Sequence, residues 1–257
     1  MLLALDVGNL TISVGLFDKQ GNLKFLATLD TDKSKTADQI AIDLMNLFQL
    51  YRYDLNDVSG TIYCSVVPPM DFGIEKALTR LFGKTPIRVG PGVKTGLNIR
   101  TGIHTQLGVD LVSGAVAAIN KFEPPIIMIM MGSATVFCYI TEQKSFEGGL
   151  LFPGVTVSLE ALSRRTSQLP DVSFVKPVSL IGKTTEDCMQ SGIVYGTAAM
   201  MDGIIDRIQK LTEKPASVVV TGANAPVIVQ YCNSKVVYDK NLVMDGLYQI
   251  YRKNSNW

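Results

Sequence analysis

The chain has 257 residues, enough for one large domain or two of ordinary size. Its 24 Lys and Arg residues nearly balance 23 Asp and Glu, and this net charge of +1, without a long basic run, argues against a nucleic-acid-binding groove. The longest uncharged apolar run, residues 124–132, is too short to span a bilayer, and the N-terminus has no signal-peptide pattern. We therefore expect a soluble, cytoplasmic protein without nucleic-acid or membrane partners.

The first half of the chain is predicted to contain three strands, a helix, a strand, a helix and a short strand. Alternating and continuous apolar runs predict the strands at residues 2–5, 11–17, 23–29 and 61–67 and near Ile87. The helices are predicted at residues 36–51, where Thr36 is a suitable N-cap, and at 70–82. A glycine-rich piece at residues 90–96 interrupts the pattern, and a helix at 108–122 follows.

The second half opens as the first did, with a strand, a glycine turn and a returning strand. Strands are predicted at residues 126–130, 136–140, 145–151 and 217–221, and helices at 155–165, 186–211 and from about 241. This repeated order predicts an α/β fold built from a duplicated unit, with a ligand cleft between the copies. We place the domains at residues 1–115 and 116–257.

The cysteines and the histidine show no pattern typical of a metal site or of a catalytic nucleophile. Cys64, Cys138, Cys188 and Cys232 are isolated in sequence, so we expect small buried side chains and neither a zinc site nor a disulfide framework. His104 is the only histidine. A Ser/His/Asp triad or a multi-histidine metal site is therefore not expected.

Asp6-Val7-Gly8-Asn9, at the end of the first strand, is the most informative short motif. A turn with glycine lets backbone N–H groups approach phosphate oxygens, and a carboxylate at the end of the strand can hold hydrated Mg²⁺ beside them. An Asp followed by a glycine turn also closes many ordinary hairpins. Both interpretations remain open on this motif alone.

Short polar and glycine-rich pieces follow one another over nearly the whole chain. In order they are Asp6-Val7-Gly8-Asn9, Ser65-Val66-Val67-Pro68-Pro69, Gly90-Pro91-Gly92-Val93-Lys94-Thr95-Gly96, Leu107-Gly108-Val109-Asp110, Gly132-Ser133-Ala134-Thr135, Gly148-Gly149 with Pro153-Gly154, residues 159–170, Ile181-Gly182-Lys183-Thr184-Thr185, residues 189–196, and Thr221-Gly222. No single piece is diagnostic, but together they resemble the type III pantothenate kinases of the acetate and sugar kinase, Hsp70 and actin superfamily.

This resemblance implies two ribonuclease-H-like domains, a homodimer, and ATP-dependent phosphorylation of pantothenate, the first step toward coenzyme A. It implies ATP and Mg²⁺ as cofactors. The positions it assigns to nucleotide and metal are Asp6 for the metal, Gly8, Asn9, Gly132, Ser133 and Thr135 for the ATP phosphates, and Gly222 near the nucleoside. The remaining parts of phosphoryl transfer are the orientation and deprotonation of the acceptor hydroxyl.

On the substrate side, Asp110 matches the general base of the family. The alternative is an ordinary acidic residue that stabilises the N-terminus of a helix. Gly108 and Thr185 match positions that contact pantothenate, and Lys94 falls in a family loop near the cleft. A solvated loop lysine is the alternative for Lys94.

Several positions depart from the family pattern. Met130 stands where the family has an Asp that supports monovalent cation binding, and a thioether cannot replace a carboxylate for K⁺. Leu111 replaces an Arg that pairs with the pantothenate carboxylate, which removes a bond of about 1.5–3 kcal/mol. Residues 101–104 replace a Tyr-x-Asn-Pro piece, and Leu10 replaces a Thr. Arg100 or His104 could supply the missing positive charge.

Two hypotheses of different class follow. The first is a working kinase for pantothenate or a related hydroxylated small molecule, with altered cation and substrate contacts, and it is favoured because Asp6 and Asp110 are both present. The second is a nucleotide-binding or regulatory homologue, similar to transcriptional accessory factors, with impaired catalysis. A sugar kinase or an actin-like filament protein is a third alternative that does not explain the loop at residues 90–96.

Overall fold

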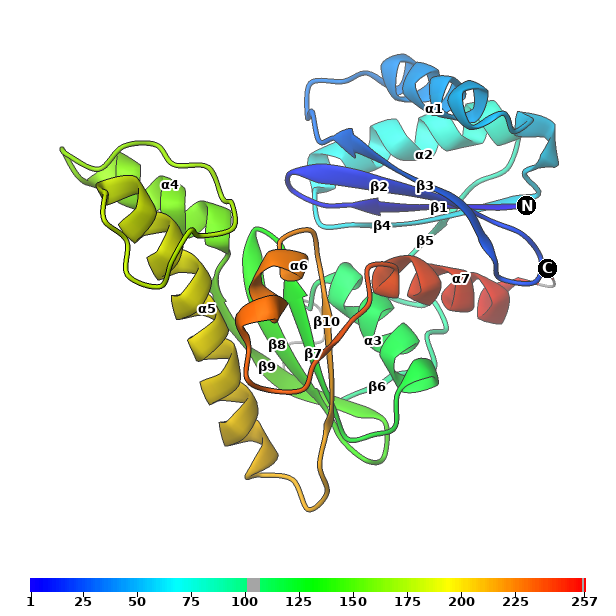
Figure 1. The fold of residues 1–257 in the computed structure, drawn as a ribbon. Coiled ribbons are helices and arrows are strands. Elements are labelled where there is room, and N and C mark those ends of the chain that lie inside the picture. Colours follow the sequence, from blue (N-terminus) through cyan, green and yellow to red (C-terminus); the bar gives the residue numbers. More distant parts are fainter. Residues whose placement is uncertain (101–106, 256) are drawn as a thin grey trace. The chain divides into compact units, whose positions relative to one another are not determined.

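The computed structural model describes residues 1–100, 107–255 and 257. These residues form two compact units (Figure 1). The first unit takes its described residues from 1–96, 103–117 and 242–257, and the second from 97–102 and 118–241. The chain therefore enters the second unit at residues 97–102, leaves the first unit again in the middle of one helix, and returns to it for the last helix.

The first unit contains a five-stranded sheet in the order β3-β2-β1-β4-β5. Its strands are β1 (Leu2–Val7), β2 (Thr11–Phe17), β3 (Leu23–Asp30), β4 (Gly60–Ser65) and β5 (Ile87–Arg88). The first three form an antiparallel meander, and β4 and β5 continue the sheet in parallel beside β1. The apolar runs of β1 and β4 are buried on both faces, as parallel central strands require.

Helices cover both faces of this sheet (Figure 1). On one face lie α1 (Ala37–Tyr51) and α2 (Pro68–Phe82), which share a core with Leu3, Leu5 and Val7 of β1. On the other face, α7 (Leu242–Asn254) contacts β1 and β4. A short 3-10 helix spans Leu55–Asp57, and α3 (Val109–Lys121) begins in this unit. Because side chains alternate along a strand, Asp6 points away from the α1 and α2 face.

The second unit repeats this arrangement. Its six-stranded sheet has the order β11-β10-β7-β8-β9-β6. The strands are β6 (Asn98–Ile99), β7 (Ile126–Met131), β8 (Ala134–Ile140), β9 (Ser145–Pro153), β10 (Ser217–Thr221) and β11 (Val237–Tyr238). The meander of β7, β8 and β9 and the parallel strands β10 and β11 match the connectivity of the first sheet. The predicted duplication is confirmed.

The long helix α5 (Thr185–Gln209) contributes Val194, Ala198 and Met201 to the core of the second unit, against Ile127 and Ile129 of β7. The other helices of this unit are α4 (Val155–Arg165), α6 (Ala225–Ile228) and a 3-10 helix at Val229–Tyr231. Thr184 caps α5 in a capping box with Asp187. In the described residues, every helix is too short or too polar to cross a bilayer.

The C-terminal segment packs on the N-terminal unit. Residues 242–257 follow the second unit in sequence but belong to the first by their contacts. The indole of Trp257 donates a hydrogen bond to the Ser59 hydroxyl at 2.7 Å and packs edge-on against Tyr248 and Tyr251. The division into domains at residues 1–115 and 116–257 stays a prediction.

Candidate functional site

The turn after β1 is closed by its own backbone. The N–H of Gly8 donates to the carbonyl of Thr11 at 3.0 Å, and a Cβ on Gly8 would lie 3.1 Å from the same oxygen. Thr31, just after β3, fixes the turn: its hydroxyl donates to the Gly8 carbonyl at 2.7 Å and its N–H to the Leu10 carbonyl at 3.0 Å. Asn9 and Leu10 are exposed. The result is a fixed turn whose tip faces solvent.

Two acids and a thiol lie behind this turn, on the face of the sheet opposite α1 and α2. Asp6 and Cys64 are direct neighbours across the parallel pair of β1 and β4, and the Cys64 thiol donates to Asp6 Oδ1 at 3.3 Å. Asp110 projects from the first turn of α3. Ser113, one turn further along α3, contacts the sulfur of Cys64. The four side chains therefore form one polar cluster in an apolar setting.

The electrostatics of this cluster favour the protonated acids. Burial is the largest cause, and the charge of Asp110 the second, of a pKa for Asp6 that is raised to about 7; the hydrogen bond from Cys64 opposes the shift. Burial also raises the pKa of Asp110, against a hydrogen bond from the N–H of Leu111. A carboxylate with a raised pKa is a stronger base than an exposed one, and a cation beside the pair would relieve the repulsion.

The corresponding turn of the second unit brings three glycines together. The N–H of Gly132 donates to the Ala134 carbonyl at 2.9 Å, and the N–H of Gly154 donates to the Ser133 carbonyl at 3.0 Å. A Cβ on Gly154 would lie 2.2 Å from the carbonyl oxygen of Gly132. Gly222, at φ +109°, has no more space, since its Cβ would lie 2.2 Å from the Met131 carbonyl. Only glycine fits at these two contacts.

Met130 holds the place in the second sheet that Asp6 holds in the first. Each is the fifth residue of the first strand of its unit's antiparallel meander, two residues before the turn glycine. Asp6 is paired with Ser13 and Cys64, whereas Met130 is paired with Val136 and Thr221. The duplicated fold therefore carries an acidic cluster in one copy and a thioether in the other.

The predicted substrate residues are distributed over both units. In the first unit, Gly108 precedes α3, and a Cβ there would lie 2.4 Å from Asp110 Oδ1, so glycine gives the acid its room. Leu111 is partly buried. In the second unit, Thr185 is the first residue of α5 and is exposed. Thr135, predicted to contact phosphate, is 1% exposed and paired with Met131.

Of the predicted cations, Lys94 is held through its backbone and Arg100 lies beside an acid. The backbone of Lys94 is held by Asn254 of α7, which accepts from the Lys94 N–H and donates to its carbonyl, both at 2.9 Å. Arg100 lies 3.8 Å from Glu147, and both side chains are exposed by more than a third. An ion pair of this kind is weak enough to be exchanged for a ligand. His104 lies outside the described residues.

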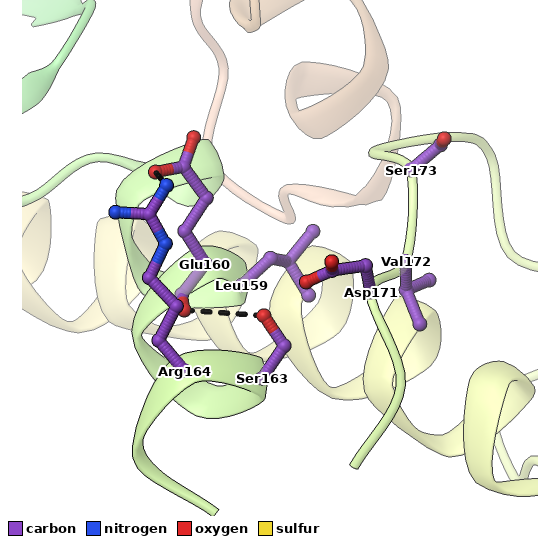
Figure 2. A pocket seen from close by; sticks show the side chains of 7 residues that line it. All are labelled: Leu159, Glu160, Ser163, Arg164, Asp171, Val172 and Ser173. Carbon is purple, nitrogen blue, oxygen red and sulfur yellow. Dashed lines mark hydrogen bonds and ion pairs between the residues drawn. The ribbon is translucent and has the colours of Figure 1, made fainter.

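Two surface hollows lie away from the predicted site residues. One, of about 300 Å³, is lined by α4 and the segment after it, with Glu160 and Arg164 side by side (Figure 2). The other, of about 340 Å³, lies between the first turns of α1 and α2. Neither is enclosed or lined by a cluster of buried polar groups, and we assign neither to the site.

The sequence matches the model of one protein family, described as type III pantothenate kinase, over residues 2–207. The chain belongs to the type III pantothenate kinase family. The match includes every site residue predicted from the motifs except Gly222, and it ends before α6, β11 and α7. The resemblance inferred from the short motifs is thereby confirmed.

Solved structures show the same fold. A conserved protein from Campylobacter jejuni, provisionally named a Baf family transcriptional activator, is 19% identical with a TM-score of 0.61, over 99% of this chain and 100% of that one. The activator of 2-hydroxyisocaproyl-CoA dehydratase from Clostridium difficile, with bound ADPNP, is 11% identical with a TM-score of 0.59, over 98% and 95% of the two chains. A Sinorhizobium meliloti protein provisionally named a 2-dehydro-3-deoxygalactonokinase is 12% identical with a TM-score of 0.59, over both full lengths. The fold is therefore the two-domain, ribonuclease-H-like fold of actin-like ATPases and sugar kinases.

The cofactors implied by the kinase family fit these residues unequally. Asp6 and Asp110 offer hard carboxylate oxygens, and Mg²⁺ is commonly held by one or two carboxylates, water and substrate phosphates. Within the described residues, no three or more His, Cys, Asp or Glu side chains form a group that could hold a metal ion. A carboxylate-held monovalent cation does not fit at Met130, because its thioether is neutral and soft.

The structure adds Cys64, Ser113 and Gly154 to the residues predicted for the site. Cys64, expected to be a small buried side chain, is buried but donates to Asp6. Gly154, noted only as part of a family motif, packs against the Gly132-Ser133 turn. The pairing of β1 with β4 would have placed Cys64 beside Asp6. Of the other cysteines, Cys138 is buried as expected, Cys232 is partly buried and Cys188 is exposed, which corrects the expectation for Cys188.

Proposed function

We propose that the protein phosphorylates pantothenate with ATP, as the first step of coenzyme A biosynthesis. The observation that carries this proposal is the pairing of Asp6 and Asp110 in a chain that belongs to a kinase family. Both side chains are partly buried, and the charge of Asp110 raises the cost of ionising Asp6, which isolated structural carboxylates on a surface would avoid. Phosphoryl transfer needs a base for the acceptor hydroxyl and a ligand for the metal, and the two acids can supply these two roles.

Asp110 is the proposed base. Its carboxylate takes the proton of the acceptor hydroxyl as the hydroxyl oxygen bonds to the γ-phosphorus, while the bond from that phosphorus to the bridging oxygen breaks and ADP leaves. Asp6 is the proposed ligand of Mg²⁺, which neutralises the charge that develops on the phosphates. Gly108 and Thr185 are the proposed contacts to pantothenate.

The phosphates are assigned to the two glycine turns, with one refinement that the hydrogen bonds suggest. Gly8 and Gly132 use their own N–H groups to close the turns. Their contribution to nucleotide binding is therefore the absence of a side chain, and the amides of Asn9 and Ser133 are the better candidates to donate to phosphate oxygens. We assign Thr135 to the same function and Gly222 to the nucleoside.

The test is a coupled assay for ADP release by the purified chain, with and without pantothenate. We expect pantothenate-dependent turnover, and we expect Asp110→Asn to lower kcat by about 10²–10⁴ while ATP still binds, because only proton transfer is lost. Turnover of the wild type that does not require pantothenate, or an active Asp110→Asn variant, would contradict the assignment.

The missing Arg at Leu111 gives a second test. Leu111→Arg restores the charge that pairs with the pantothenate carboxylate in the family, so we expect the KM for pantothenate to fall about ten- to a hundredfold. Leu111→Met, which keeps the side chain apolar and of similar volume, is the control and should leave KM unchanged. An increase in KM for Leu111→Arg would indicate that another cation, such as Arg100, already fills this role.

The second candidate function is a nucleotide-binding or regulatory homologue. It is favoured by the substitutions at Leu111 and Met130 and by the likeness to the Campylobacter jejuni protein named as a transcriptional activator. Thermal shift separates the candidates, because a ligand that binds the folded state raises its stability. Stabilisation by ATP but not by pantothenate would favour this second function.

A homodimer and a cytoplasmic location are part of the same proposal, carried over from the family. The dimer is tested by light scattering after size-exclusion chromatography, and a monomer across the working concentration range would exclude it. The location is tested by fractionating cells that express the tagged full chain.

A further inference from the structure

Cys64 occupies a position that packing alone does not explain. It lies on β4, directly opposite Asp6 of β1, and is 0% exposed. A buried free cysteine usually behaves as a small apolar side chain. Here its sulfur lies 3.3 Å from Asp6 Oδ1 with the geometry of a hydrogen bond, and the thiol is the donor.

This hydrogen bond distinguishes the two oxygens of the Asp6 carboxylate. The thiol donates to Oδ1 and not to Oδ2. An aspartate has a freely rotating terminal torsion unless hydrogen bonds restrict it. A donor from the adjacent strand therefore selects one orientation of the carboxylate plane.

Cys64 also connects Asp6 to the helix that carries Asp110. Ser113 of α3 contacts the sulfur of Cys64, and its hydroxyl donates to the Val109 carbonyl at 2.8 Å. Ser113 is itself fully buried, so α3 is fixed to the sheet at this point. One thiol thus contacts both the strand of one acid and the helix of the other.

We propose that Cys64 is a positioning residue for the metal: it holds the Asp6 carboxylate by Oδ1 so that Oδ2 is presented to Mg²⁺. This inference rests on the proposed function in taking Asp6 as the metal ligand. Groups that hydrogen-bond to metal ligands commonly change metal affinity by about 10–100-fold when they are removed. A thiol is a weak donor, so we expect the lower end of that range.

The experiment measures Mn²⁺ binding to the full chain in the presence of ADP, by the loss of the electron paramagnetic resonance signal of free Mn²⁺. Cys64→Ala removes the donor, and Cys64→Val removes it while filling most of the space. Cys64→Ser keeps a donor. Cys138→Ala is the matched control, because Cys138 is a buried cysteine in the second sheet, 1% exposed.

We expect Cys64→Ala and Cys64→Val to weaken Mn²⁺ binding about tenfold, and Cys64→Ser and Cys138→Ala to stay within about threefold of the wild type. In turnover, the Mg²⁺ requirement of Cys64→Ala should rise while the KM for pantothenate does not change. Equal weakening by Cys64→Ala and Cys64→Ser, or no weakening by either donor-free variant, overturns the inference. So does a wild type that binds no Mn²⁺ with ADP.

The binding experiment does not depend on pantothenate. If the wild type binds Mn²⁺ with ADP and the variants follow the expected order, Cys64 is a positioning residue even if pantothenate is not phosphorylated. In that case only the proposed substrate is wrong. Unfolding of Cys64→Ala, recognised by circular dichroism, leaves Cys64→Val against Cys64→Ser as the deciding pair.

Discussion

The charge of Asp110, on α3, raises the pKa of Asp6, on β1, adding to the larger effect of burial. Two residues more than a hundred positions apart in sequence therefore share one electrostatic environment. The resulting pKa of Asp6 is about 7, well above the value of an aspartate in an unfolded chain. As pH rises past this pKa, the stability of the metal-free protein should fall, whereas metal binding to the ionised carboxylate should become tighter.

The first prediction concerns stability without metal. Between about pH 4 and pH 7 the folded chain keeps a proton on Asp6 that the unfolded chain has lost, so the free energy of unfolding falls as pH rises, by at most about 4 kcal/mol. Asp6→Asn has no proton to lose and should remove this part of the fall. Urea unfolding in EDTA at several pH values measures it, with Asp30→Asn at the exposed end of β3 as the control. Parallel curves for wild type and Asp6→Asn would contradict the prediction.

The second prediction concerns the glycine contacts of the second turn. Gly222→Ala places a Cβ 2.2 Å from the Met131 carbonyl at φ +109°, so we expect a loss of about 3 kcal/mol or more and no stabilisation by ATP. Gly83→Ala is the matched control, because φ is +67° and the space around its Cβ is open. That variant should lose only about 1–2 kcal/mol, from backbone strain alone. Chemical denaturation and thermal shift with ATP measure both, and equal losses would show that the close contact is relieved by a small shift.

The third prediction concerns the contact between α3 and α7. A Cβ on Gly246 would lie 1.8 Å from the Ser113 carbonyl, so Gly246→Ala should push α7 from α3 and destabilise the first unit by about 2–3 kcal/mol. Gly192 of α5 is exposed with open space, and Gly192→Ala should instead stabilise by up to about 1 kcal/mol through helix propensity. Denaturant midpoints of the two variants should move in opposite directions. A stabilised Gly246→Ala variant would rule out the close packing.

The fourth prediction concerns the monovalent cation. Because Met130 cannot serve as a carboxylate ligand, we expect turnover and thermal stability in KCl and in choline chloride of equal ionic strength to agree. Met130→Asp restores the acid, and KCl should then stabilise that variant selectively. Selective stabilisation of the wild type by K⁺ would place the cation on other ligands.

Much of the fold could be predicted because its strong periodic segments agree with the tertiary structure. The strand predicted at residues 11–17 and the helix at 155–165 have the bounds of β2 and α4, and the N-cap expected at Thr36 forms a capping box with Gln39. The restart of the pattern at residue 126 predicted the second copy correctly. Of the two-residue strands, β5 was predicted near Ile87, whereas β6 and β11 were missed because so short a strand gives little periodic signal.

The site is harder to predict, because its parts are joined by long-range pairing. The motifs indicated Asp6 and Asp110 individually, and only the pairing of β1 with β4 places Cys64 beside Asp6. The same holds for Gly154, which meets the Gly132-Ser133 turn through tertiary packing. Composition offers no signal for such contacts. The roles of these residues in binding and catalysis stay predictions.

The packing of α7 has a consequence for biosynthesis. The ribosome delivers residues 118–241 before Leu242–Asn254, yet α7 covers one face of β1 and β4 at the beginning of the chain. Throughout translation of the intervening segment, the nascent chain therefore holds an incomplete N-terminal layer with apolar strands open on one side. Slow synthesis near the end would prolong the period in which a chaperone, or another nascent chain, can bind there.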